Sequence, residues 1–193
     1  MTLVWDVETT GLWRKDLAPD DPSQPHVVSI AARLFDKDRR TVGHLNVLIR
    51  LDGWSIEAGA AAVHGITEAK ANRYGIPIQA ALIVFKGMVE QGIEVVAHNL
   101  AFDRQLIDRE LRGGGWNGAW WERAAPKMHC TMEESTPICD LPGKFGQKYP
   151  SLQEAHAILV PEVPWTQAHS ADDDVLATSR VLWALRDRVE AAR

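Results

Sequence analysis

The chain has 193 residues, of which 46% are hydrophobic, and a formal net charge of −5. This length and apolar content are enough for one sizeable core, so we expect a single domain over residues 1–193. The negative charge excludes a protein coated with phosphate contacts, but it does not exclude a pocket that binds a few nucleotides.

No segment has the pattern of a membrane span or a leader peptide. The longest apolar stretches, such as AALIVF at residues 80–85, are far too short to cross a bilayer, and Asp6 interrupts any signal-peptide hydrophobic region. We therefore expect no membrane contact and a cytoplasmic location. Cys130 and Cys139 lack CxxC spacing and a further Cys/His cluster, so we expect reduced, structural cysteines.

The first part of the chain predicts strands. Residues 2–8, 26–35 and 41–50 are rich in Val, Ile and Leu and are separated by turn-forming segments, so the sheet should begin antiparallel. A helix is expected from Pro77 to about Gly92, because an apolar stripe recurs at helical spacing. The stripe consists of Ile78, Leu82, Phe85 and Val89.

The second part alternates strand and helix. A buried strand is predicted at residues 93–99, a helix from about 100 to 112, and a last helix from Ser170 nearly to the C-terminus. The inward residues of this last helix should be Val175, Leu182, Leu185 and Val189. The order predicts an α/β fold with a mixed sheet, antiparallel in its first three strands and then parallel, flanked by helices.

Residues 113–150 are rich in Gly, Pro and Trp and predict no clear elements. Their tryptophans, Trp116, Trp120 and Trp121, could stack on bases, but packing beneath this long segment is the favoured interpretation.

Two carboxylates stand one residue apart at the end of the first predicted strand. Alternate residues of a strand share a face, so Asp6 and Glu8 should point the same way, about 6 to 7 Å apart along the backbone. Like charges at the end of an apolar strand repel one another unless a cation lies between them. Oxygen ligands alone favour Mg²⁺ or Mn²⁺ over zinc. A solvated strand end is the structural alternative.

A third carboxylate, Asp103, shares a helical stripe with Ile107 and Leu111, so it should face the core. An inward carboxylate needs a partner, which could be a cation or a basic residue such as Arg104 or Arg109.

The segment HSADDDVLAT at residues 169–178 reads as a helix start, with Ser170 as N-cap. Asp172 and Asp173 can then be satisfied by the helix dipole and solvent, whereas Asp174 should face inward near Val175. His169 would lie on the preceding loop, where an imidazole can act as general base.

The segments DVETTGL, HNLAFD and HSADDD, in this order, resemble the three motifs of the DEDDh, or DnaQ-like, 3′→5′ exonucleases. VHGIT at residues 63–67 matches a further family segment, and KYPSLQEAH at 148–156 resembles the helix before the third motif. The resemblance runs from Thr2 to about Arg180 and implies a ribonuclease H-like fold. His169 precedes Asp174 by five residues, which indicates the histidine subtype rather than the tyrosine subtype.

The resemblance implies a role for each matching residue. Asp6, Glu8 and Asp174 would bind one Mg²⁺, Asp6 and Asp103 would hold a second, and His169 would be the base; Mn²⁺ should be able to substitute. The residues that would contact the terminal nucleotide are Thr9, Thr10, Gly11, Leu12, His64, Asn99 and Phe102.

The implied activity is metal-dependent 3′→5′ hydrolysis of single-stranded or frayed DNA ends, which releases nucleoside 5′-monophosphates. The implied partners are nucleic acid 3′ ends, with single-stranded DNA favoured. An RNA 3′ exonuclease similar to oligoribonuclease is one alternative, and a catalytically silent nucleic-acid-binding version of the fold is another. The presence of all five motif side chains argues against the silent version. The loop at residues 13–26 is longer than is usual in the family, and no family residue maps to it.

Overall fold

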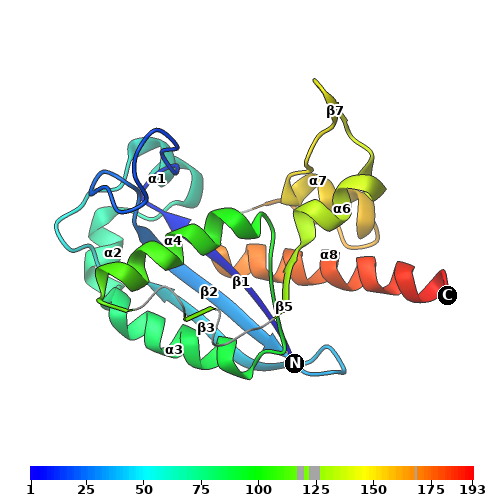
Figure 1. Cartoon of the computed structure of the whole chain (residues 1–193), viewed down its shortest axis with the longest axis horizontal. Coiled ribbons are helices and arrows are strands. Elements are labelled where there is room, and N and C mark those ends of the chain that lie inside the picture. The colour runs from blue at the N-terminus through cyan, green and yellow to red at the C-terminus, as the bar shows by residue number, and fades with distance from the viewer. Residues whose placement is uncertain (117–119, 122–126, 168) are drawn as a thin grey trace.

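The computed structural model describes residues 1–193 except 117–119, 122–126 and 168. Its centre is a five-stranded sheet with the strand order β3-β2-β1-β4-β5 (Figure 1). The strands are β1 (Thr2–Thr9), β2 (Val27–Phe35), β3 (Thr41–Leu48), β4 (Glu94–Ala97) and β5 (Lys127–Cys130). β1, β2 and β3 pair antiparallel, whereas β4 runs parallel to β1 and β5 parallel to β4. The predicted mixed sheet is therefore confirmed.

The helices are α1 (Ala58–His64), α2 (Glu68–Tyr74), α3 (Ile78–Gln91), α4 (Leu100–Gly113), α6 (Thr131–Cys139), α7 (Leu152–Leu159) and α8 (Ala171–Ala191), and β6 (Pro142–Gly143) and β7 (Gly146–Gln147) form a short hairpin. The sequence predicted α3, α4, α8 and the first four strands to within about two residues, and it placed α7 slightly early. It did not predict α1, α2, β5, α6 or the hairpin.

The alternation of side chains along β1 divides the core into two layers. Leu3, Trp5 and Val7 pack with the apolar stripes of α3 and α4 on one face of the sheet. Val4 points to the other face and packs with Val175 of α8. α3 and α4 thus cover one face of the sheet and α8 covers the other (Figure 1). Because Asp6 and Glu8 continue the Val4 series, they point toward the α8 side.

Two of the three tryptophans in the segment after α4 belong to the core. Trp120 and Trp121 are 3% and 2% exposed, and the ring centroid of Trp121 lies 6.0 Å from that of Trp5. Trp116 is partly buried against the same core, with the Lys86 Nζ 3.8 Å from its ring centroid. The expectation of packing is confirmed for Trp120 and Trp121.

The last helix is buried over most of its length. Val175, Leu182 and Leu185 face inward as predicted. The prediction for Val189 is wrong, because this side chain is 54% exposed. The C-terminal end of α8 projects away from the sheet (Figure 1).

Among the described residues, no helix is both long and apolar enough to cross a membrane. Cys130 and Cys139 are buried and free, as expected for structural thiols.

Candidate active site

Three carboxylates from opposite ends of the sequence meet where β1 ends. β1 supplies Asp6 and Glu8, both half-buried, on the face that α8 covers. The first turn of α8 supplies Asp174, which is 5% exposed. Each of the three side chains offers one oxygen, and these oxygens all lie within 4.8 Å of one another. The predicted convergence of Asp6, Glu8 and Asp174 is therefore present.

The fourth carboxylate, Asp103, comes from α4 and is 3% exposed. Pairing between β1 and β4 ends at Val4 and Val96, so the N–H of Val7 lies beyond the parallel ladder. The Oδ1 of Asp103 accepts a hydrogen bond from this N–H at 3.2 Å. Asp103 thereby fastens α4 to β1 directly beside the other acids. Within the described residues, the alternative of an ion pair with Arg104 or Arg109 is not found.

The four carboxylates destabilise one another when all are ionised. Burial, followed by the charges of Asp103, Asp174 and Glu8, raises the pKa of Asp6 well above its ordinary value. Burial is also the main cause that raises the pKa of Glu8 to about 8, that of Asp103 to about 8 and that of Asp174 to about 6. In the described part of the chain, none of the four pairs with a lysine or an arginine. The cluster lacks a compensating positive charge among these side chains.

A divalent cation fits this donor set. The Oδ2 of Asp174 accepts a hydrogen bond from the Nε2 of Gln167 at 2.7 Å, while its Oδ1 is buried and has no hydrogen-bond partner among the described residues. Leaving a buried carboxylate oxygen unpaired is costly unless a cation binds it. Oxygen-only ligands of this kind suit a hard cation such as Mg²⁺ or Mn²⁺.

His169 lies immediately before α8, as predicted, and is exposed. Its backbone φ of 48° is in the left-handed region, and the imidazole is near enough to Asp174 to oppose in part the rise that burial causes in the pKa of that carboxyl. Ser170 is the N-cap residue, but its side chain makes no capping hydrogen bond. The prediction for Asp172 is wrong: its carboxylate binds Arg33 of β2, Nη2 to Oδ2 at 2.8 Å, and His44 of β3, Nε2 to Oδ1 at 2.8 Å.

Two further histidines near the site have both ring nitrogens engaged. The Nδ1 of His64 accepts from the N–H of Ile66 at 3.0 Å, so its Nε2 carries the proton that is donated to the Thr9 carbonyl at 3.1 Å. The two nitrogens of His98 contact the Thr131 hydroxyl and the Pro150 carbonyl. Burial lowers the pKa of His64, and it lowers that of His98 to about 4. Both side chains act as structural connectors.

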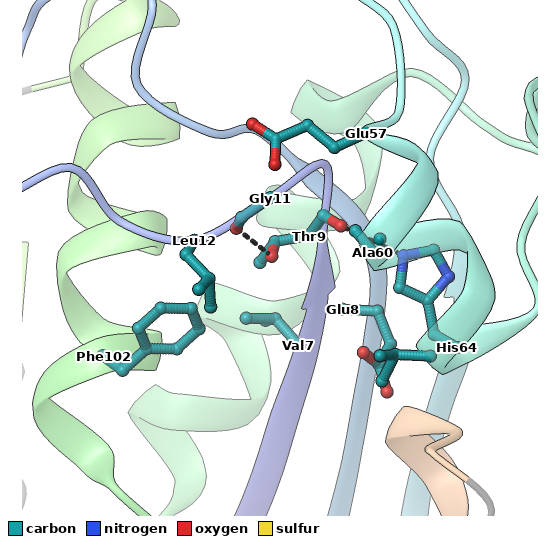
Figure 2. A pocket seen from close by; sticks show the side chains of 11 residues that line it. Val7, Glu8, Thr9, Gly11, Leu12, Glu57, Ala60, His64 and Phe102 are labelled. Atoms are coloured by element: carbon teal, nitrogen blue, oxygen red, sulfur yellow. Dashed lines mark hydrogen bonds between the residues drawn. The ribbon is translucent and has the colours of Figure 1, made fainter.

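A cavity of about 350 Å³ opens beside Glu8 (Figure 2). Of the predicted substrate contacts, those that line it are Thr9, Gly11, Leu12, His64 and Phe102. Figure 2 shows Leu12 and Phe102 side by side at one wall and His64 near Glu8 at the other.

Two predicted contacts lie elsewhere. The buried Thr10 holds the chain in place, because its hydroxyl accepts from the N–H of His26 at 2.9 Å. Asn99 lines a neighbouring cavity that shares Leu12 and Phe102 with the first.

The sequence did not point to Glu57, which also lines the cavity near Glu8. A Cβ on Gly11 would lie 2.5 Å from the Cδ of Glu57, so the end of this exposed side chain packs directly over Gly11 and would have to move if that residue were larger. A single acid in a loop carries no pattern from which this approach could have been inferred.

The family model for exonucleases of the RNase T type matches residues 3–182, which is most of the chain. The chain belongs to this exonuclease family. The four acids and His169 make it an exonuclease of the DEDDh type, as the sequence motifs indicated.

The chain is 32% identical over 108 residues to a DNA polymerase III subunit epsilon-like protein of Rhodobacter capsulatus; the match covers 56% of this chain and 14% of that protein. Its fold matches E. coli exonuclease I in complex with a dT13 oligonucleotide, with a TM-score of 0.76 and 17% identity, over 99% of this chain and 42% of that chain. A zinc-bound complex of the same E. coli enzyme with single-stranded DNA gives a TM-score of 0.77 and 16% identity, over 97% and 40% of the two chains. The ribonuclease H-like fold is thereby confirmed, and the chain spans less than half of each of these proteins.

Proposed function

We propose that this exonuclease removes nucleotides one at a time from the 3′ ends of single-stranded or frayed DNA and releases nucleoside 5′-monophosphates. The observation that carries the proposal is the meeting of four acids and one exposed histidine beside a cavity with an apolar wall. A module that only binds nucleic acid has no use for four clustered acids, since they repel phosphate.

Asp6, Glu8 and Asp174 would hold one divalent cation, and Asp6 with Asp103 would hold a second. Two such ions, when bound, neutralise charge and lower the pKa of the attacking water. The formal charges of the site would cancel, because four ionised carboxylates match two Mg²⁺ ions. The chain contributes the rigid placement of these acids. Asp6 and Glu8 lie in β1 itself, and the hydrogen bond from the Val7 N–H holds Asp103 against the same strand.

His169 is the proposed general base. It is exposed beside Asp174, so it can accept a proton from water at the mouth of the site. His64 and His98 are poor candidates, because each would have to give up a structural hydrogen bond in order to accept a proton.

The cavity beside Glu8 is the proposed place of the terminal nucleotide. Its volume of about 350 Å³ lies at the small end of the range for ligand sites. Leu12 and Phe102 offer an apolar wall for a base, whereas the hydroxyl of Thr9 is already committed to the Gly11 carbonyl at 2.7 Å. Binding there would therefore depend on apolar contact and backbone groups.

DNA is favoured over RNA because the E. coli structures that share the fold hold DNA oligonucleotides. An RNA exonuclease similar to oligoribonuclease remains the second candidate. The expected cytoplasmic location also stays a prediction from the sequence.

One assay tests the direction, the substrate and the metal together. Single-stranded DNA and RNA of one sequence, labelled at the 5′ or at the 3′ end, are incubated with Mg²⁺, Mn²⁺ or EDTA. We expect a ladder of 5′-labelled DNA products, immediate release of the 3′ label as a mononucleotide, and no reaction in EDTA. A ladder from the 3′-labelled strand would contradict the direction, faster hydrolysis of RNA would favour the second candidate, and full activity in EDTA would contradict the metal site.

A further inference from the structure

A second cavity, of about 630 Å³, lies on the far side of Leu12 and Phe102 from the acids. These two residues line both cavities, so they form the partition between them. One wall of the second cavity is the start of α4, with Asn99 and Gln105. The opposite wall is the segment after β1, with Trp13 and Lys15, which belongs to the long loop without counterpart in the family motifs.

We propose that this second cavity is a subsite, specific to the 13–26 loop, for the nucleotide that precedes the terminal one, with Lys15 as the contact to its phosphate. The proposal rests on the proposed function, because it assumes that a nucleic acid 3′ end occupies the first cavity.

The chemistry of the lining suits a nucleotide. Trp13, Leu17 and Phe102 supply apolar and aromatic surface on which a base can stack, and such stacking contributes about 1 to 3 kcal/mol per base in proteins that bind single strands. The amides of Asn99 and Gln105 can donate to and accept from base edges. The cavity volume is within the range of about 300 to 1,000 Å³ that is typical of small-molecule sites.

Lys15 is the cation of this cavity. It is exposed, and within the described residues it forms no ion pair. The loop as a whole is not a basic patch, because Asp16 and Asp20 are exposed as well. Arg14 is a second exposed cation of the loop, but Lys15 is the one that lines the cavity, so a phosphate bound there would be attracted to the Lys15 ammonium group.

The loop is held in shape before any ligand binds. Gln24 is 2% exposed, and its side chain spans the loop: Oε1 accepts from the N–H of Arg14 at 3.0 Å, and Nε2 donates to the carbonyls of Arg14 at 2.7 Å and Ala18 at 3.2 Å. A buried amide with its hydrogen bonds satisfied in this way fixes one loop conformation.

The end of the loop is fastened to α4. The ring of His26 stacks on Trp54 at 4.3 Å, and its Nδ1 lies 3.1 Å from the Oε1 of Glu110. The Nη2 of Arg109 donates to the carbonyl of Asp21 at 3.2 Å. Both walls of the second cavity thus belong to one braced unit, so binding there requires little ordering of the loop.

The test compares two substrates that differ in whether they carry a phosphate for Lys15. A 5′-labelled oligothymidylate has a preceding nucleotide with its own phosphate, whereas in thymidine 5′-monophosphate p-nitrophenyl ester a p-nitrophenyl group without a phosphate takes the place of that nucleotide. Lys15→Gln should raise KM for the oligonucleotide about tenfold, the loss expected for one charge-assisted contact, and should leave kcat unchanged. Turnover of the ester should not change.

The salt dependence distinguishes a phosphate contact from a structural effect. Binding of the labelled strand is measured by fluorescence anisotropy in EDTA, so that this readout does not depend on hydrolysis. Lys15→Gln should make the slope of log K against log salt less negative by about 0.7, which is the contribution of one phosphate contact to a single strand. Lys15→Arg should restore the slope. Lys37→Gln, which removes the same charge at the exposed turn after β2, is the matched control.

A second variant tests whether the Gln24 hydrogen bonds that hold the loop in shape support this subsite. Gln24→Ala should raise KM for the oligonucleotide and leave ester turnover unchanged, with the circular dichroism spectrum of the wild type. If Lys15→Gln has the same KM and salt slope as Lys37→Gln, or if ester turnover falls in parallel with oligonucleotide turnover, the subsite is refuted. If the wild type binds the strand but hydrolyses neither substrate, the proposed function fails, and the salt slopes still decide the subsite.

Discussion

The replacement of Asp174 by Asn should stabilise the metal-free protein while abolishing its hydrolytic activity. The pKa of this carboxyl rises to about 6 from an ordinary value of 3.8, mainly through burial. Between those two pH values the folded state binds more protons than the unfolded state, so the stability of the metal-free wild type falls as pH rises through this window. Asn carries no charge and should remove this decline.

The magnitude follows from the pKa difference. About two pKa units correspond to roughly 3 kcal/mol at most, reached above pH 6 and absent below pH 4. For a chain of this length, such a gain would raise Tm by up to about 10 °C. The amide oxygen of Asn can still accept from Gln167, and its NH₂ group would face the carboxylates of β1, so the replacement adds no unpaired charge.

Divalent metal should reverse the order of stability. A cation that binds only the folded wild type adds about 4.1 kcal/mol when its free concentration is about one thousand times Kd, which exceeds the roughly 3 kcal/mol gained by the variant, and the variant should lose most of this metal-induced gain. The assay is thermal unfolding at pH 5 and pH 8, each in EDTA and in Mg²⁺, with exonuclease activity measured in parallel.

Asp173→Asn is the matched control, since its carboxylate accepts from the Nε1 of Trp165 at 3.3 Å and is not one of the three clustered acids. It should keep both the activity and the response to metal. If Asp174→Asn melts below the wild type in EDTA at pH 8, or keeps the full Mg²⁺-induced rise in Tm, the electrostatic reasoning is refuted. Loss of activity in Asp173→Asn alone would assign the ligand to that residue.

Three further outcomes are expected. His169→Ala should lower single-turnover rates by about 10² to 10⁴ and abolish the acidic limb of the pH–rate profile, yet keep the rise in Tm with Mg²⁺; an unchanged acidic limb would require another base. Asp172→Asn should cost about 1 to 3 kcal/mol in urea unfolding at pH 7 with activity retained, because it leaves the half-buried Arg33 unpaired. Burial raises the pKa of Asp172, but hydrogen bonds from Arg33 and His44 outweigh it and hold this pKa below its usual range. The stability that ionised Asp172 contributes should therefore be lost on acidification. An equal difference in unfolding free energy between wild type and Asp172→Asn at pH 7 and pH 3 would contradict the ion pair. Ser151→Ala should cost about 0.5 to 2 kcal/mol, because Ser151 and Glu154 form a capping box on α7, and a loss near zero in the same urea titration would contradict this.

The acids of the site could be found from the sequence because local periodicity fixes their direction. In β1, alternation alone places Asp6 and Glu8 together with Val4, and in α4 the spacing to Ile107 and Leu111 turns Asp103 inward. Long elements with a regular apolar pattern were predicted well for the same reason.

Features that depend on contacts between distant residues could not be predicted. The three adjacent acids at the start of α8 look alike in the sequence, but in the structure Asp172 binds Arg33 of β2 and His44 of β3. α1 and α2 have seven residues each and lack an apolar stripe, and β5 is a four-residue edge strand. The exposure of Val189 depends on where the sheet ends beneath α8, which the pattern of that helix does not contain.

The pairing of β1 with α8 has a consequence for the synthesis of the protein. Asp6 and Glu8 leave the ribosome before His169 and Asp174, which follow only after β1 to β5 have been made. A nascent chain that has folded β1 through α7 but has not yet added α8 therefore lacks the proposed base and one of the clustered acids (Figure 1). Under the proposed function, the enzyme would thus stay inert beside messenger and ribosomal RNA until its last helix docks. Proteolytic removal of that one helix would also inactivate it in a single step.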